Sequence, residues 1–212
     1  MSQDFVTFDV NGLPPGKVYE LVSNLVVPRP IAFVSTLDQF GVANLAPFSF
    51  FNVGGIAPAS LVFCCVNNID GSMKDTAKNI LQTREFVVNL VTRTMADGMN
   101  STSAAVPSHV DEWVRSGFHR VKSSKVQPDR VLESPVQFEC SLFELVKHGE
   151  GPGASCYVIG EILAIHVSRM AIPGESEQAF APIARLGGPE YLDLESGEKF
   201  RLQRPTIETT DS

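Results

Sequence analysis

Short apolar runs separated by turn-forming residues recur along the chain. Residues 31–37 (IAFVSTL) and 85–91 (EFVVNLV) are rich in β-branched and aromatic residues, and 60–66 (SLVFCCV) is an unbroken apolar run of strand length. Residues 136–142 alternate apolar and polar positions with a period of two, and 156–167 (CYVIGEILAIHV) form another long strand candidate. The pattern predicts roughly six or seven strands.

Hairpin-like connections join several of these strands. Residues 38–41 (DQFG) place Asp first and Gly fourth, as in a type I turn, and 42–46 (VANLA) follow as a returning strand. One helix is predicted from about Ser72 to Gln82, and another within 110–118. Because helices are few and do not alternate regularly with strands, the pattern favours an antiparallel barrel with short inserted helices over a doubly wound sheet.

Composition and charge narrow the range of functions. The chain has 212 residues, 43% of them hydrophobic, which suits a single domain spanning 1–212. A net charge of −7 argues against nucleic-acid binding. The N-terminal residues do not resemble a secretory signal, and no apolar run approaches membrane-spanning length. We therefore expect a cytoplasmic protein with no membrane partner.

Motifs for metal binding, dinucleotide binding and hydrolysis are missing from the sequence. The four cysteines have no C-x-x-C or Cys/His spacing and are expected to be buried thiols. There is no G-x-G-x-x-G after a strand, no Walker A motif and no G-x-S-x-G elbow, and the four histidines are scattered. No residue is therefore assigned as a metal ligand or as an acid–base catalyst.

The start of the predicted helix, residues 71–81 (GSMKDTAKNIL), carries an unusual charge pattern. Ser72 and Asp75 have the spacing of a capping box, yet Lys74 and Lys78 place two cations at the positive end of the helix. A doubly charged anion such as a phosphate monoester would explain them. The alternative is that both lysines face solvent, which charge pattern alone favours.

A second stretch, residues 34–52, gathers small polar side chains around the predicted hairpin. Ser35, Thr36, Asn44 and Ser49 lie among small and aromatic residues there, and Asn52 ends the stretch. Such a set suits a site for a flat polar heterocycle, and it suits equally a hairpin with capped turns.

An ordered series of motifs resembles the flavin reductase-like family of FMN-binding split barrels, which includes flavoredoxins and ferric reductases. The matching segments are RPIAFVSTLDQFGVANLAPFSFFN (29–52), SMKDTAKNI (72–80), EFVVNLV (85–91), MNSTS (99–103), VDEW (110–113), ESPVQFEC (133–140), VIGEI (158–162) and RLGGPEY (185–191). They cover about residues 20–195, so the resemblance implies a core over this range and a polar C-terminal tail.

The resemblance implies a six-stranded antiparallel Greek-key split barrel that forms a homodimer and binds FMN without a covalent bond. The residues it places along the isoalloxazine ring are Ser35, Thr36, Asn44, Leu45, Ala46, Ser49 and Asn52. It places the FMN phosphate at Ser72, Lys74, Asp75 and Thr76, with Arg29 near the flavin and Arg185 and Tyr191 in a loop that closes over the cofactor. Met73 stands where relatives often carry arginine, which implies either a lower affinity for the phosphate or compensation by Lys78 or Arg84.

The implied activity is transfer of a hydride from NAD(P)H to FMN, and of electrons onward to a flavin, a ferric chelate or a small organic acceptor. The main alternative is an FMN-carrying electron-transfer protein that a partner protein reduces. A third possibility is a barrel that has lost its cofactor, and the lysine kept at the helix start argues against it.

Overall fold

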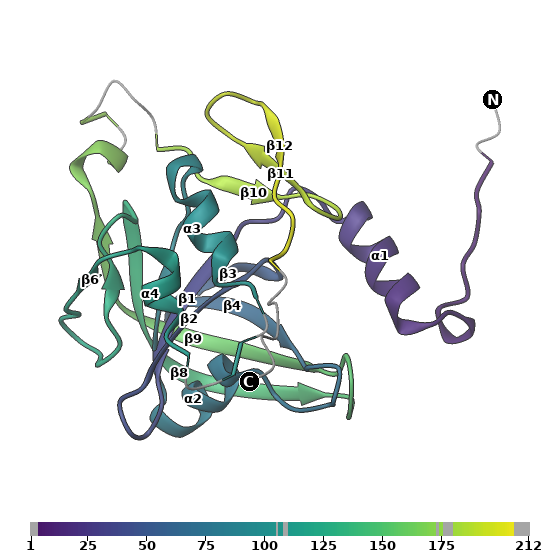
Figure 1. The fold of residues 1–212 in the computed structure, drawn as a ribbon, viewed down its shortest axis with the longest axis horizontal. Helices are drawn as coiled ribbons and strands as arrows, with labels where there is room; N and C mark the ends of the chain where they lie inside the picture. Colours follow the sequence, from purple (N-terminus) through teal and green to yellow (C-terminus); the bar gives the residue numbers. More distant parts are fainter. Residues whose placement is uncertain (1–3, 105, 108–109, 173, 176–179, 206–212) are drawn as a thin grey trace, which may run out of the picture.

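An antiparallel sheet forms the body of the protein (Figure 1). It has seven strands, in the order β2-β1-β5-β8-β9-β4-β3. The computed structural model describes residues 4–104, 106–107, 110–172, 174–175 and 180–205. The strands of this sheet are β1 (Ala32–Leu37), β2 (Ala43–Phe48), β3 (Phe51–Ile56), β4 (Ala59–Val66), β5 (Glu85–Asn89), β8 (Val136–His148) and β9 (Ser155–Val167). Only Ser49 and Phe50 separate β2 from β3, so the chain draws the two ends of the sheet together, as a barrel requires.

The predicted fold class is confirmed, and the strand count is corrected. The described residues form a mainly β structure with antiparallel pairing and a few short helices, as expected. The main sheet has seven strands, one more than the six that the family resemblance implied, because β3 also pairs with β4. Gly54 and Gly55 lie in β3, next to an irregularity in its register, and glycines of this kind weaken the sequence signal of a strand.

The remaining elements lie around the barrel. The helices are α1 (Pro15–Leu25), α2 (Asp75–Thr83), α3 (Ala96–Ser101) and α4 (Glu112–Ser116), with single 3₁₀ turns at Val10–Gly12, Arg93–Met95 and Arg169–Ala171. The short strands are β6 (Arg120–Val121) and β7 (Arg130–Val131), which pair, and β10 (Ile183–Arg185), β11 (Glu190–Asp193) and β12 (Lys199–Arg201), which form a three-stranded sheet. No helix within these residues is long and apolar enough to cross a bilayer.

Two hydrophobic clusters hold these elements together. The first fills the barrel and includes Phe63, Phe86 and Ile80, so it fixes α2 to the sheet. Gly160 belongs there because a Cβ atom at this position would lie 2.2 Å from the Phe86 ring. The second cluster, which includes Trp113, joins the barrel to α3, α4 and the three-stranded sheet. The four cysteines are buried with free thiols, as predicted.

The N-terminal segment differs from the rest of the fold because it projects from the barrel (Figure 1). Apolar side chains along it face solvent, among them Phe5 (79% exposed) and Leu25 (76% exposed). The segment is fixed at its C-terminal end, where the buried Arg29 donates hydrogen bonds to the carbonyl groups of Ser23 and Val26. An arm with this much exposed apolar surface suggests an interaction surface.

Candidate functional site

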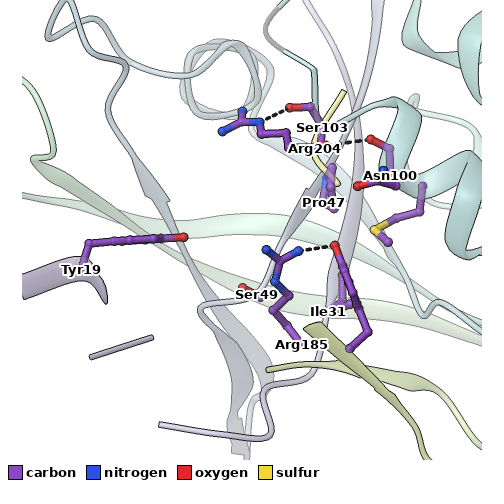
Figure 2. A pocket seen from close by; sticks show the side chains of 10 residues that line it. Tyr19, Ile31, Pro47, Ser49, Asn100, Ser103, Arg185 and Arg204 are labelled. Carbon is purple, nitrogen blue, oxygen red and sulfur yellow. Dashed lines mark hydrogen bonds between the residues drawn. The ribbon is translucent and has the colours of Figure 1, made fainter. Parts of the chain in front are cut away.

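A cavity of about 190 Å³ lies where the end of β2 meets α1, α3, the three-stranded sheet and the C-terminal segment (Figure 2). Its lining residues are Tyr19, Ile31, Pro47, Ser49, Met99, Asn100, Ser103, Arg185, Tyr191 and Arg204. Among the residues that the structure describes, two arginines and no carboxylate line it, although the whole chain carries a net charge of −7. The cavity is therefore a local positive region suited to an anionic ligand.

The position of β2 explains why the side of the cavity formed by Pro47 and Ser49 is accessible to a ligand. β2 is at the edge of the sheet order, and its Ala46 pairs with Val34. Pro47 has no N–H to offer a neighbouring strand, which is why proline is tolerated at this edge. The chain then passes Ser49 on the cavity wall before β3 begins. Small side chains on an edge strand leave the backbone approachable by a ligand.

Arg185 and Tyr191 form one wall of the cavity and pair across β10 and β11. The Arg185 guanidinium donates to the Tyr191 hydroxyl and to the Gly188 carbonyl, and it lies 4.5 Å from the Tyr191 ring centroid. Burial raises the pKa of Tyr191, and the Arg185 charge partly offsets the rise. The pair thus holds a fixed positive charge at the cavity, and the prediction that its loop closes over a cofactor stays a prediction.

Arg29 lies beside this wall, but its side chain is bonded to backbone carbonyl groups of the protein. Its backbone pairs with that of Arg185, with N···O distances of 3.0 and 2.8 Å, and its side chain is only 6% exposed. In addition to its bonds to α1, the guanidinium donates to the Leu186 carbonyl at 2.9 Å. Burial lowers its pKa. The structure gives Arg29 the role of joining α1 to the barrel, and its predicted contact with a flavin stays a prediction.

Most of the polar side chains predicted along the ring are buried and bonded to the protein. The Ser35 hydroxyl donates to the Asp129 carbonyl. Asn79 of α2 donates to Thr36 at 3.0 Å, and Asn44 donates to Thr76 of α2 at 2.9 Å. These bonds fix α2 against the hairpin, and among the predicted ring residues only Ser49 also lines the cavity.

The remaining residues predicted along the ring do not line the cavity. Leu45 is fully buried in the cluster beneath the cavity, and Ala46 is half-buried next to Pro47. Asn52 is exposed, and its side-chain oxygen accepts the Val53 N–H at 2.8 Å. Contact of these residues with a ring stays a prediction.

The predicted start of the α2 helix is wrong by three residues. The helix begins at Asp75, with Lys74 at the N-cap, and no side chain caps it. Ser72 instead closes the preceding turn, where its N–H donates to Asp70 at 2.8 Å and its hydroxyl accepts from Asn68 at 3.0 Å. The capping box is therefore absent, because Ser72 belongs to the turn.

Lys74, Lys78 and Arg84 lie at different points along α2. Lys78 pairs with Asp75 at 3.1 Å, and Arg84 donates to the Leu142 carbonyl at the opposite end of the helix. Met73 packs against the barrel core, and compensation for it by Lys78 or Arg84 stays a prediction. Lys74 is half-buried, and its pKa is lowered by burial and, next, by the charge of Arg204.

A buried carboxyl group lies on the outer side of β2. Glu112 opens α4 and is 8% exposed. Burial raises its pKa to about 7, and the nearby carboxylates of Asp75 and Asp111 add to the rise, while the backbone N–H groups of Glu112 and Leu45 act against it. The Glu112 side chain thus lies against the backbone N–H of Leu45, on the side of β2 that faces away from β1.

Sequence reasoning missed four polar residues of the cavity, which come from segments distant in the sequence. Asn100 and Ser103 lie within MNSTS, which the family resemblance matched without assigning them a role. Tyr19 comes from α1, and Arg204 comes from the tail beyond the matched core. The chain gives no local signal for these two residues, because only the tertiary fold brings them to the cavity.

Comparison with known proteins gives a consistent picture. The profile of the Flavin reductase like domain matches residues 24–177. An uncharacterized protein of Aquifex aeolicus is 38% identical over 193 residues, covering 89% of this chain and 94% of that protein. The crystal structure of nitrilotriacetate monooxygenase component B from Bacillus cereus is similar with a TM-score of 0.85 and 28% identity, over 95% of this chain and 100% of that one. The crystal structure of the Pseudomonas fluorescens 2-nitrobenzoate 2-nitroreductase NbaA is similar with a TM-score of 0.78 and 30% identity, over 98% of this chain and 100% of that one.

Proposed function

Because the chain belongs to the flavin reductase-like family, we propose that it is an FMN-binding oxidoreductase that takes a hydride from NAD(P)H. The observation that carries the proposal is the cavity beside β2, whose described lining contains two arginines and no carboxylate. FMN and NAD(P)H are both anionic through their phosphates, so such a cavity favours them over neutral or cationic ligands.

The residues at and near the cavity fit the parts of FMN. Ser49, Asn100 and Ser103 present hydroxyl and amide groups on its wall, which suit the polar ribityl chain and ring edge. Lys74 and the first turn of α2 supply positive charge and free backbone N–H groups for the phosphate. When bound, FMN supplies the hydride-accepting chemistry, which no side chain of the protein provides.

The protein itself is proposed to bind and orient the flavin and to stabilise the negative charge of its reduced form. The Arg185 guanidinium is held by Tyr191 and Gly188, so it keeps its position without a ligand. A fixed cation of this kind stabilises negative charge that develops on a reduced ring. We assign no acid–base catalyst, since this chemistry does not require one.

The electron acceptor is proposed as a small molecule. Among the similar structures of known function, NbaA is named as a reductase of 2-nitrobenzoate and is 30% identical to this chain. A small organic acceptor therefore joins a free flavin and a ferric chelate as a candidate. A site open at a strand edge suits the entry of such molecules.

We further propose that the protein forms a homodimer through the N-terminal arm. The arm exposes a row of apolar residues that a second copy of the chain would cover. Leu25→Asp is expected to produce monomers in sedimentation velocity experiments, because it buries a charge in the interface. Phe40→Asp is the control, since Phe40 is 82% exposed in the β1–β2 turn. A wild-type monomer, or a dimer that survives Leu25→Asp, would contradict the proposal.

An anaerobic titration of the FMN-loaded protein with NADH and with NADPH tests the activity. Binding of FMN is measured first by fluorescence, and reduction is then followed by loss of the oxidised flavin absorption. Rapid bleaching by either nucleotide is the expected result. FMN that stays bound and oxidised would contradict the nicotinamide step and would support the electron-carrier alternative, in which a partner protein reduces the flavin.

A further inference from the structure

The cavity beside β2 is small and partly apolar. Its volume is about 190 Å³, below the roughly 300–1,000 Å³ of pockets that enclose drug-sized ligands. FMN and NAD(P)H are too large for this space, so no more than one edge of either can enter it. Ile31, Pro47 and Met99 add apolar surface to its lining, and Tyr19 and Tyr191 add aromatic rings. The space therefore suits a single-ring molecule with an apolar face.

The C-terminal segment brings a cation to this space and fixes it there. The Asn100 amide donates to the Gln203 carbonyl at 2.8 Å, and the Arg204 Nε–H donates to the Ser103 carbonyl at 2.8 Å (Figure 2). Because Nε makes this bond, the two terminal nitrogens of the Arg204 guanidinium keep their N–H groups for a ligand. Arg204 is thus held on the cavity wall with donors to spare.

Both arginines of the cavity are positioned by neutral oxygen atoms. Arg204 bonds to the Ser103 carbonyl, and Arg185 bonds to the Tyr191 hydroxyl and the Gly188 carbonyl. Among the described residues neither guanidinium forms an ion pair with a carboxylate, and the described lining contains no carboxylate. The two charges are therefore fixed in place without being neutralised, which favours an anionic ligand.

We propose that this cavity binds a small aromatic carboxylate, with the carboxylate group on the terminal nitrogens of Arg204. This rests on the proposed function and deepens it, because it names the class of the organic acceptor. The planar guanidinium matches the two oxygens of a carboxylate, and the apolar and aromatic lining covers a ring. Inorganic phosphate has no apolar face and gains nothing from that lining. Ser49, which is predicted along the flavin ring, lines the same cavity, so the acid would lie beside the flavin.

Equilibrium binding to the oxidised, FMN-loaded protein tests the proposal without any electron transfer. Calorimetric titrations are made with benzoate, with benzamide, which has the ring but no charge, and with acetate, which has the charge but no ring. Benzoate is expected to bind about tenfold or more tightly than either, because it alone uses both the arginine and the apolar lining. Benzoate that does not bind, or that binds no more tightly than benzamide or acetate, would overturn the proposal.

Arg204→Gln separates the carboxylate contact from the rest of the cavity. The variant is expected to bind benzoate about ten- to a hundredfold more weakly, with benzamide and FMN unchanged, because a charge-assisted contact is lost. Arg201→Gln is the matched control, since it removes an exposed arginine of β12 that does not line the cavity. An equal loss of benzoate and benzamide binding in Arg204→Gln, or no loss, would refute the role of Arg204. The comparison of ligands on the wild-type protein decides the matter if this variant folds poorly.

The carboxylate site and the proposed function can fail separately. If the wild-type protein binds no FMN, the proposed function fails, and the same titrations are made on the FMN-free protein. Tighter binding of benzoate than of benzamide and acetate would support the carboxylate site even then, and its absence would overturn the site. If FMN binds and is reduced by NAD(P)H while benzoate does not bind, only the carboxylate site fails.

Discussion

Replacing Glu112 by Gln is expected to stabilise the protein at neutral pH and to flatten the pH dependence of its stability. Glu112 is 8% exposed, and burial raises its pKa from 4.5 to about 7. Gln keeps a side-chain oxygen to face the Leu45 backbone N–H that acts on the Glu112 carboxyl group, and it carries no charge. The substitution therefore removes the titration while it preserves the contact with β2.

The sign and size of the effect follow from the two pKa values. The folded state binds more protons than the unfolded chain between pH 4.5 and about 7, so the free energy of unfolding falls as the pH rises through this window. The contribution is complete below the unfolded pKa and is lost once the folded pKa has been passed. The shift corresponds to a loss of about 3 kcal/mol for wild type relative to the variant.

Urea unfolding at a series of pH values measures this difference. The fluorescence of Trp113, the single tryptophan of the chain, reports on the neighbourhood of Glu112. The stability advantage of Glu112→Gln is expected to grow from about pH 5 to about pH 7 and then to remain level. Glu144→Gln is the control, since Glu144 is exposed on β8. A difference between wild type and Glu112→Gln that does not change with pH would refute the reasoning.

Three further substitutions test the packing around the site. Arg29→Met leaves three backbone carbonyl groups without their donor, so we expect a loss of about 3 kcal/mol in thermal unfolding; an unchanged melting temperature would contradict the role of Arg29. Thr76→Val leaves the buried Asn44 amide without its acceptor and should cost about 1–2 kcal/mol in urea unfolding, with no loss expected if solvent satisfies that amide. Gly160→Ala places a Cβ atom 2.2 Å from the Phe86 ring and should cost about 1–3 kcal/mol by calorimetry, and Phe86→Leu in the same chain should recover part of this loss.

The strands were predictable where local pattern and burial agree. The hairpin of 31–46 and the alternating run of β8 follow from β-branched residues and a period of two, and the structure contains both. β3 was missed because its two glycines carry no side chains to produce such a pattern. The α2 helix was predicted, but its start was misplaced, since Ser72 can close a turn as readily as it can cap a helix.

The site was harder to predict than the fold. Thr36 and Asn44 were predicted to border a ring and are bonded to α2, because a hydroxyl or amide that faces a ligand and one that faces a neighbouring helix give the same sequence signal. Arg204 could not be predicted for a different reason: its place at the cavity depends on a contact with Ser103, which is far away in the sequence. Sequence reasoning finds local chemistry, whereas a site assembled from distant segments needs the tertiary structure.

The edge position of β2 has a consequence for the behaviour of the protein in a crowded solution. Backbone groups of alternate residues on an edge strand point outward, where they can pair with a strand of another molecule. On β2 the pairing with β1 directs Ala43, Leu45 and Pro47 outward; Pro47 has no N–H, and Glu112 covers that of Leu45. Only Ala43 keeps an outward donor without such protection. The open side of the barrel is therefore expected to resist strand-to-strand aggregation.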